Sequence, residues 1–196
     1  MKIYCDYDST LNTLAQAWTD WANRLYHTNI TTKDILHWNW MGERFGGSVN
    51  DFWKNADIYK NDVVTVLPGS IPFIKTLQSL FGKENVFIVT HSWPGTEVEK
   101  DKQIRRKFGF INIIHEADKF RVTNDGILID DRACTVGYHC QINKMRGIVF
   151  NNNNNYGWST KEFIEDFETV QTLVSFKQSY EDTFEYLVKL YKDGVY

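Results

Sequence analysis

The sequence has few cysteines and no long hydrophobic run. Its 196 residues include three cysteines, Cys5, Cys134 and Cys140, too few for a disulfide scaffold and an odd number that suits a reducing compartment. No charged-then-apolar leader opens the chain, and no apolar run reaches the roughly 18 residues that a membrane span needs. We therefore expect a soluble cytoplasmic protein without a membrane partner.

The sequence also lacks an excess of positive charge. There are 22 Lys and Arg residues against 25 Asp and Glu residues, and the formal net charge is −3 at pH 7. A protein that grips long nucleic acid through its phosphates needs a broad positive field. We therefore expect no long nucleic acid as a partner, whereas a local site for a small anion is compatible with this charge.

Hydrophobic residues make up 42% of the chain and gather in short runs. Such runs occur at 1–5, 86–89, 127–129 and 148–150, with a weaker one at 111–114, and they are typical of strands buried on both faces. Helical patterns separate them. The sequence therefore predicts an α/β fold, in which helices flank a Rossmann-like parallel sheet and ligands bind at the carboxyl ends of the strands.

The segment between the first strand and Pro68 does not follow this alternation. It contains an amphipathic pattern at 11–25 and an aromatic stretch at 34–53, which we interpret as a small helical cap inserted after the first strand. A capping box at Ser159 and Glu162 predicts the start of a later helix. The expected units are a core domain at 1–12 and 69–176, the cap at 13–68, and a C-terminal helix in 177–196 that packs on the core.

Polar side chains follow four of the predicted strands. Any one of them alone is commonplace, because an Asp-x-Asp pair is usually a turn or a helix cap and a lone Lys is usually solvated. The carboxyl ends of parallel strands share one edge of the sheet, so we expect these side chains to lie together. They are Asp6 and Asp8 after the first strand, Thr90 after the second, Lys119 after the third, and Asp130 and Asp131 after the fourth.

This order, D-x-D-x-T, then Thr, then Lys, then an acidic pair, resembles the haloacid dehalogenase (HAD) superfamily of phosphotransferases. Within it, the chain is similar to the 5'(3')-deoxyribonucleotidases over about residues 1–170. The chain departs from the family pattern at Ser9, where Gly is usual, and at His91, where a small hydroxyl residue is usual. The further matching stretches are WMGERFG at 40–46, LPG at 67–69, the K-x8-G run from Lys100 to Gly109, LIDDR at 128–132, and Trp158.

The resemblance implies a Mg²⁺-dependent phosphomonoesterase that works through an aspartyl-phosphate. Asp6 would be the nucleophile and a metal ligand. Asp8 would serve as general acid and then as general base, and its main-chain carbonyl would bind the metal. Asp131 would be the direct metal ligand of the acidic pair, with Asp130 as its close supporter. Because a halide needs no proton to leave, a carboxylate at position 8 favours phosphoryl transfer over dehalogenation.

The resemblance also implies a phosphate site. Thr90 and Lys119 would contact the phosphate oxygens, and the main-chain N–H of His91 would serve there whatever its side chain does. Lys100 is a second candidate cation, and the alternative for it is a solvated helix lysine.

The aromatic cap stretch indicates a flat ligand held by stacking. Trp40 and Phe45 are the positions that match the family, and we expect Trp40 to stack on a nucleobase. The alternative is that the rings form the cap's own small core. We favour that alternative for Trp18, Trp21, Phe52 and Trp53; Trp38 belongs to the same stretch.

Three function classes remain open. The first is a phosphoric monoester hydrolase of the 5'-nucleotidase type acting on nucleoside monophosphates. The second is a HAD phosphatase for another small phosphoester or a nucleic-acid 3'-phosphate, which the missing basic groove disfavours. The third is a non-catalytic HAD-fold binding protein, which the intact polar set disfavours. Base, sugar and phosphate-position preferences stay open, as does the oligomeric state, for which a homodimer is one option.

Overall fold

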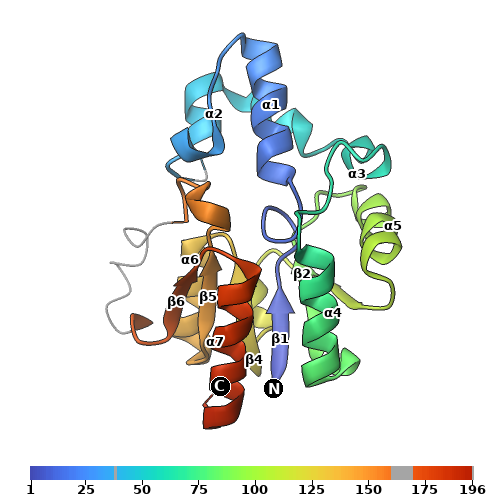
Figure 1. Cartoon of the computed structure of the whole chain (residues 1–196). Coiled ribbons are helices and arrows are strands. Elements are labelled where there is room, and N and C mark those ends of the chain that lie inside the picture. The colour runs from blue at the N-terminus through green and yellow to red at the C-terminus, as the bar shows by residue number, and fades with distance from the viewer. Residues whose placement is uncertain (38, 160–169, 196) are drawn as a thin grey trace.

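Figure 1 shows the computed structural model of the chain, which describes residues 1–37, 39–159 and 170–195. Six parallel strands form one sheet in the order β3-β2-β1-β4-β5-β6. The predicted parallel α/β fold is therefore confirmed. The strands are β1 (Lys2–Cys5), β2 (Val86–Thr90), β3 (Asn112–His115), β4 (Gly126–Asp130), β5 (Gly147–Phe150) and β6 (Val174–Lys177).

The register of the central strands places their ends together. Cys5, the last residue of β1, pairs with Ile88 of β2 on one side and with Ile129 of β4 on the other. The residues that follow these three positions therefore emerge at the same edge of the sheet, which Figure 1 shows as its upper end. This register explains why side chains distant in sequence can form one site.

Both faces of the sheet are covered, which accounts for the short apolar runs. Ile3 and Cys5 belong to the large core cluster, which also contains buried residues of α4 (Ser70–Phe81), α5 (Glu97–Phe108) and α7 (Tyr180–Asp193). On the opposite face, α6 (Ala133–Asn143) packs against β4, β5 and β6. Helices α4 and α7 lie in front of the sheet in Figure 1.

The segment inserted after β1 lies beyond the carboxyl edge of the sheet, with α1 and α2 at the top of Figure 1. The chain enters and leaves this segment side by side, because the Thr13 N–H donates to the Thr65 carbonyl (2.8 Å) and the Leu67 N–H donates to the Leu11 carbonyl (2.9 Å). Its division from the core as a separate domain stays a prediction. Its helices are α1 (Leu14–Tyr26), η1 (Thr32–Asp34), α2 (Trp40–Phe45), η2 (Gly47–Phe52) and α3 (Asp57–Lys60).

Strand β6 was not expected from the sequence. It pairs with β5 alone among the described strands, and its four residues, VSFK, are all half-buried. A strand at the side of a sheet needs no continuous apolar run, so the pattern used for the buried strands does not detect it.

The helix expected from the capping box at Ser159 and Glu162 lies outside the described residues, as does Trp38. No described helix has the length and apolar character required to cross a bilayer.

Candidate active site

A pocket opens at the carboxyl edge of the sheet, and the residues expected to follow the strand ends surround it. Asp6, Asp8, Lys119 and Asp131 line it directly. Lys119 comes from η4 (Lys119–Arg121), which follows β3. These four residues come from the ends of three strands, β1, β3 and β4. Thr90, at the end of β2, contacts Asp8 and is not among the described residues that line the pocket.

Three carboxylates form a buried cluster at the bottom of this site. Oxygen atoms of Asp6, Asp130 and Asp131 all lie within 4.8 Å of one another. The Lys119 ammonium bridges two of them, with its Nζ 2.7 Å from Asp6 Oδ1 and 2.6 Å from Asp130 Oδ2. The described ion pairs of this cluster involve Lys119 alone as the cation, so the three ionised carboxylates would keep two negative charges.

The pKa values reflect this excess of negative charge. Burial raises the pKa of Asp6 to about 7; the Lys119 ammonium opposes this shift, and the charges of Asp130 and Asp8 add to it. Burial, followed by the charges of Asp130 and Asp6, raises the pKa of Asp131 well above its usual range. Burial by itself lowers the pKa of Lys119, but Asp130 and Asp6 outweigh it and raise that pKa. A hard divalent cation that prefers carboxylate oxygens fits this donor set.

Asp131 is held in a fixed orientation. The Trp158 Nε1–H donates to Asp131 Oδ2 at 2.7 Å, and the Thr10 hydroxyl donates to Oδ1 at 3.3 Å. The Ser159 hydroxyl donates to the Asp131 main-chain carbonyl. Asp130 instead accepts from Lys119 and from the Arg132 N–H (2.8 Å). Asp131, and not Asp130, is therefore the member of the pair that lines the pocket.

Asp8 has a different set of neighbours from Asp6. Its carboxylate accepts from Lys100 Nζ (2.6 Å), from Asn12 Nδ2 (2.9 Å) and from the Tyr59 hydroxyl (3.2 and 3.3 Å to the two oxygens). The Thr90 hydroxyl is 3.5 Å from Asp8 Oδ2. The two aspartates of the D-x-D pair therefore face the same pocket with separate partners.

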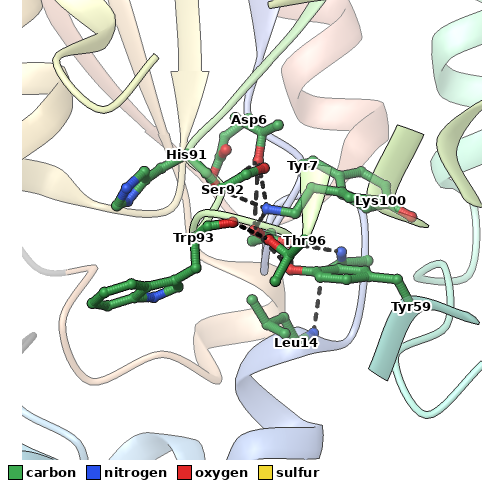
Figure 2. Close-up of polar contacts among 12 residues, drawn as sticks. Asp6, Tyr7, Leu14, Tyr59, His91, Ser92, Trp93, Thr96 and Lys100 are labelled. Carbon is green, nitrogen blue, oxygen red and sulfur yellow. Dashed lines mark hydrogen bonds and ion pairs between the residues drawn. The ribbon is translucent and has the colours of Figure 1, made fainter. Parts of the chain in front are cut away.

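Lys100 is part of the site, although it lies on a helix rich in charged residues. The residue is 1% exposed, which excludes the alternative of a solvated surface lysine. Besides Asp8, its Nζ contacts the Thr90 hydroxyl (3.2 Å) and the His91 carbonyl (2.5 Å). Figure 2 shows Lys100 and Tyr59 reaching the site from the same side.

Ser9, which departs from the family pattern, has a left-handed backbone with φ of 64°. A non-glycine residue there costs about 1–2 kcal/mol, and local hydrogen bonds offset part of this cost. The Ser9 hydroxyl accepts from the Ala15 N–H (3.2 Å) in the first turn of α1, and Asn12 Oδ1 accepts from the Ser9 N–H (3.0 Å). The turn after Asp8 is therefore formed without the usual glycine.

The loop after β2 supplies one wall of the pocket through His91 and Trp93, whose rings lie 6.3 Å apart. Burial lowers the pKa of His91, and the charges of Lys100 and Lys119 lower it further, which favours the neutral imidazole at neutral pH. Trp93 is 39% exposed. Its main-chain carbonyl accepts from the N–H and the hydroxyl of Thr96 (2.9 and 2.8 Å), which fixes this turn.

Trp40 and Phe45, predicted as substrate contacts, are not among the described residues that line this pocket. Their rings lie edge to face 6.4 Å apart, and the Arg44 guanidinium lies over both. Trp40 borders a separate hollow on the outside of the inserted segment. Their contact with a substrate stays a prediction, and their position does not support it.

Trp53 of the inserted segment does line the pocket, while its ring also packs against Trp18 at 4.8 Å. From the sequence, packing was the favoured role for Trp53, and neither Tyr59 nor Trp93 was identified. For these three residues no spacing or motif distinguishes a pocket ring from a core ring. Asn12 could have been found, because Asn is a favoured residue at helix starts, and its Oδ1 accepts from the Leu14 N–H (3.0 Å) that begins α1.

Comparison with known proteins agrees with this architecture. The HAD family hydrolase of Deinococcus radiodurans R1, whose crystal structure holds phosphate and sodium, superposes with a TM-score of 0.64 over 96% of this chain and 95% of that one, at 11% identity. A hydrolase from Pseudomonas syringae gives a TM-score of 0.55 over 97% and 98% of the two chains, at 14% identity. The fold is that of the HAD family hydrolases.

A closer relative is found by sequence. A curated 5'(3')-deoxyribonucleotidase from Clostridium acetobutylicum is 33% identical over 132 residues, which cover 64% of this chain and 70% of that protein. The chain therefore belongs to the HAD hydrolases of the 5'(3')-deoxyribonucleotidase family. No family model matches the chain.

Proposed function

We propose that the protein is a Mg²⁺-dependent phosphatase of nucleoside monophosphates, of the 5'(3')-deoxyribonucleotidase type. The observation that carries this proposal is the separation of the two motif aspartates. Asp6 sits in the acidic cluster beside Lys119, whereas Asp8 sits with Lys100, Asn12 and Tyr59. The name of the Clostridium relative supports the substrate class. The cytoplasmic location stays a prediction from the sequence, and a homodimer stays one option for the oligomeric state.

In the proposed reaction, a carboxylate oxygen of Asp6 attacks phosphorus, and the bond from phosphorus to the nucleoside oxygen breaks. The Asp8 carboxyl gives its proton to that leaving oxygen, and the resulting carboxylate then takes a proton from the water that attacks the aspartyl-phosphate. Lys100 and Thr90 already lie together beside Asp8, at the position where phosphate oxygens would be bound.

Mg²⁺ would be held by the carboxylates of Asp6 and Asp131 and by the main-chain carbonyl of Asp8. Asp130 would orient Lys119 and the backbone at Arg132. The ion would offset the negative charge that collects on the transferring phosphoryl group. Lys119, already paired with Asp6, would add a fixed positive charge beside the same group.

The aromatic rings at the pocket favour a substrate with a flat base. Trp53 from the inserted segment and Trp93 from the core both line it, together with the acidic residues. Stacking of a base on an aromatic side chain contributes about 1–3 kcal/mol. We therefore propose Trp53 and Trp93, in place of Trp40, as the rings that contact the base.

A panel of phosphoesters tests the proposed function. With Mg²⁺ present, purified protein should release phosphate from deoxyribonucleoside monophosphates with a kcat/KM roughly tenfold or more above that for sugar phosphates. A stacking contribution of about 1.4 kcal/mol corresponds to a tenfold difference. Released phosphate is measured for each compound. Equal or better rates with sugar phosphates would favour the alternative of a phosphatase for another small phosphoester, and no activity on any member would contradict both.

Trp93→Ala should lower kcat/KM for a deoxyribonucleoside monophosphate roughly tenfold more than for a small phosphoester without a ring system, because only the base loses its stacking partner. Steady-state kinetics on both substrates give this ratio. Phe110→Ala is the matched control, since Phe110 is an exposed aromatic residue (66%) that does not line the pocket. Equal losses on both substrates would remove Trp93 from the base site.

A further inference from the structure

Tyr59 brings a hydroxyl from the inserted segment to a carboxylate of the core. It lies in α3, and its hydroxyl is 3.2 Å and 3.3 Å from the two carboxylate oxygens of Asp8. The residue is only 3% exposed, so this hydroxyl is shielded from bulk water. Figure 2 shows its ring extending into the centre of the site beside Lys100.

The position of Tyr59 is set by its surroundings. Gln103 of α5 donates from Nε2 to the Tyr59 carbonyl (3.0 Å) and to the Val64 carbonyl (2.7 Å), and the Tyr7 hydroxyl donates to Gln103 Oε1 (2.6 Å). The Lys100 ammonium lies 5.0 Å from the centre of the Tyr59 ring. The main chain and the ring are therefore both held against α5, which leaves the hydroxyl little freedom to move away from Asp8.

An ion pair also fastens the same part of the inserted segment to α5. The Arg106 guanidinium lies 2.6 Å from Asp62 Oδ1, shortly after α3. Together with the Gln103 bonds, this contact holds α3 against α5. A group on α3 can therefore keep a constant geometry toward Asp8.

We propose that Tyr59 is a positioning residue for the general acid. This inference rests on the proposed function. While the bond between Asp6 and phosphorus forms and the bond to the nucleoside oxygen breaks, the Asp8 proton passes to that oxygen and Asp8 becomes a carboxylate. The Tyr59 O–H then donates to a charged acceptor, and such a hydrogen bond is stronger than one to a neutral carboxyl. The interaction therefore stabilises the transition state more than the ground state.

Lys100 cannot take over this role throughout the reaction. Its ammonium is shared between Asp8, the Thr90 hydroxyl and the His91 carbonyl. A phosphate dianion that enters the pocket would compete with Asp8 for this cation. The phenol of Tyr59 is neutral and is not drawn to the phosphate in this way, so it stays as a partner of Asp8.

Tyr59→Phe tests the proposal, because it removes the hydroxyl and keeps the ring. The kcat/KM value reports the steps up to transfer of the phosphoryl group to Asp6. A nucleoside oxygen needs a proton to leave, whereas p-nitrophenolate leaves without one. For a nucleoside monophosphate, kcat/KM should fall about 10- to 100-fold, whereas for p-nitrophenyl phosphate the fall should be at least about fivefold smaller.

Two comparisons separate positioning from a structural role. Tyr4→Phe is the matched control, because it also removes a hydroxyl that is bonded to a carboxylate, that of Asp125 (2.5 Å), near the start of β4. This variant should keep the wild-type activity on both substrates. In the Asp8→Asn background, Tyr59→Phe should have almost no further effect on kcat/KM, since the group that it orients is already lost.

Equal losses on the two substrates, or an undiminished effect in the Asp8→Asn background, would overturn the proposal and make Tyr59 a packing residue. The wild-type protein distinguishes this failure from a failure of the proposed function. If the wild type hydrolyses nucleoside monophosphates and Tyr59→Phe leaves the ratio of the two kcat/KM values unchanged, only the role of Tyr59 is contradicted. If the wild type hydrolyses neither substrate with Mg²⁺, the proposed function fails and the inference fails with it.

Discussion

Asp6→Asn is expected to lower turnover of a nucleoside monophosphate by at least about a thousandfold, because the amide keeps the volume of the side chain but cannot form the aspartyl-phosphate. Released phosphate measures the loss. Asp125→Asn is the control, since Asp125 pairs with Lys2 near the start of β4 and should have no effect on turnover. Turnover of Asp6→Asn above about a tenth of the wild-type value would contradict Asp6 as the nucleophile.

The same substitution has an expected effect on stability. Burial raises the pKa of Asp6 to about 7, above its value in the unfolded chain. Between these two pKa values, the Asp6 carboxyl of the metal-free protein is protonated in the folded state and ionised in the unfolded state. The stabilising contribution of Asp6 is complete at acidic pH below the unfolded pKa, and it is lost as the pH rises through about 7. Asn has no charge to bury, so at pH 8 the metal-free variant should melt at or above the wild-type temperature. A large drop in melting temperature would show that the loss of turnover includes unfolding.

The acidic centre could be predicted because it depends on few features of the sequence. Short buried strands indicate a parallel sheet, and parallel pairing requires their carboxyl ends to share one edge. Asp6, Thr90 and Asp130 each follow or end such a run directly, so their meeting needs no knowledge of side-chain packing. The long-range information that this placement requires is the register between β1 and its two neighbours.

The pocket walls could not be predicted in the same way, because they depend on how helices pack. The family resemblance alone made Lys100 a candidate, since nothing in its helix sequence, EVEKDKQIRRKF, marks it as the buried lysine. It is buried because α3 packs against α5, which brings Tyr59 over its side chain. The aromatic stretch of the inserted segment likewise gives no means to tell Trp40, on an outer surface, from Trp53, at the pocket.

Mg²⁺ is expected to stabilise the fold as well as to support turnover, since the acidic cluster exists in the folded chain only. Two segments of the chain, the ends of β1 and β4, bring Asp6, Asp130 and Asp131 within 4.8 Å of one another, with Lys119 as their described counter-ion. A ligand that binds only the folded state at about 100 times its Kd adds about 2.7 kcal/mol to the free energy of unfolding. For a chain of this size that corresponds to a rise of roughly 5–10 °C in melting temperature.

Thermal unfolding with and without Mg²⁺ measures this shift, and a chelator should reverse both the shift and the activity. Asp131→Asn should remove most of the shift, because it deletes the pocket-lining ligand that Trp158 and Thr10 orient. Asp125→Asn, which removes an exposed carboxylate elsewhere, should keep it. A Na⁺ titration serves as the comparison, since a site with two uncompensated charges should prefer the divalent ion. An equal shift in melting temperature in Asp131→Asn would place the cation elsewhere. Full activity in the presence of a chelator would exclude the cation from the reaction.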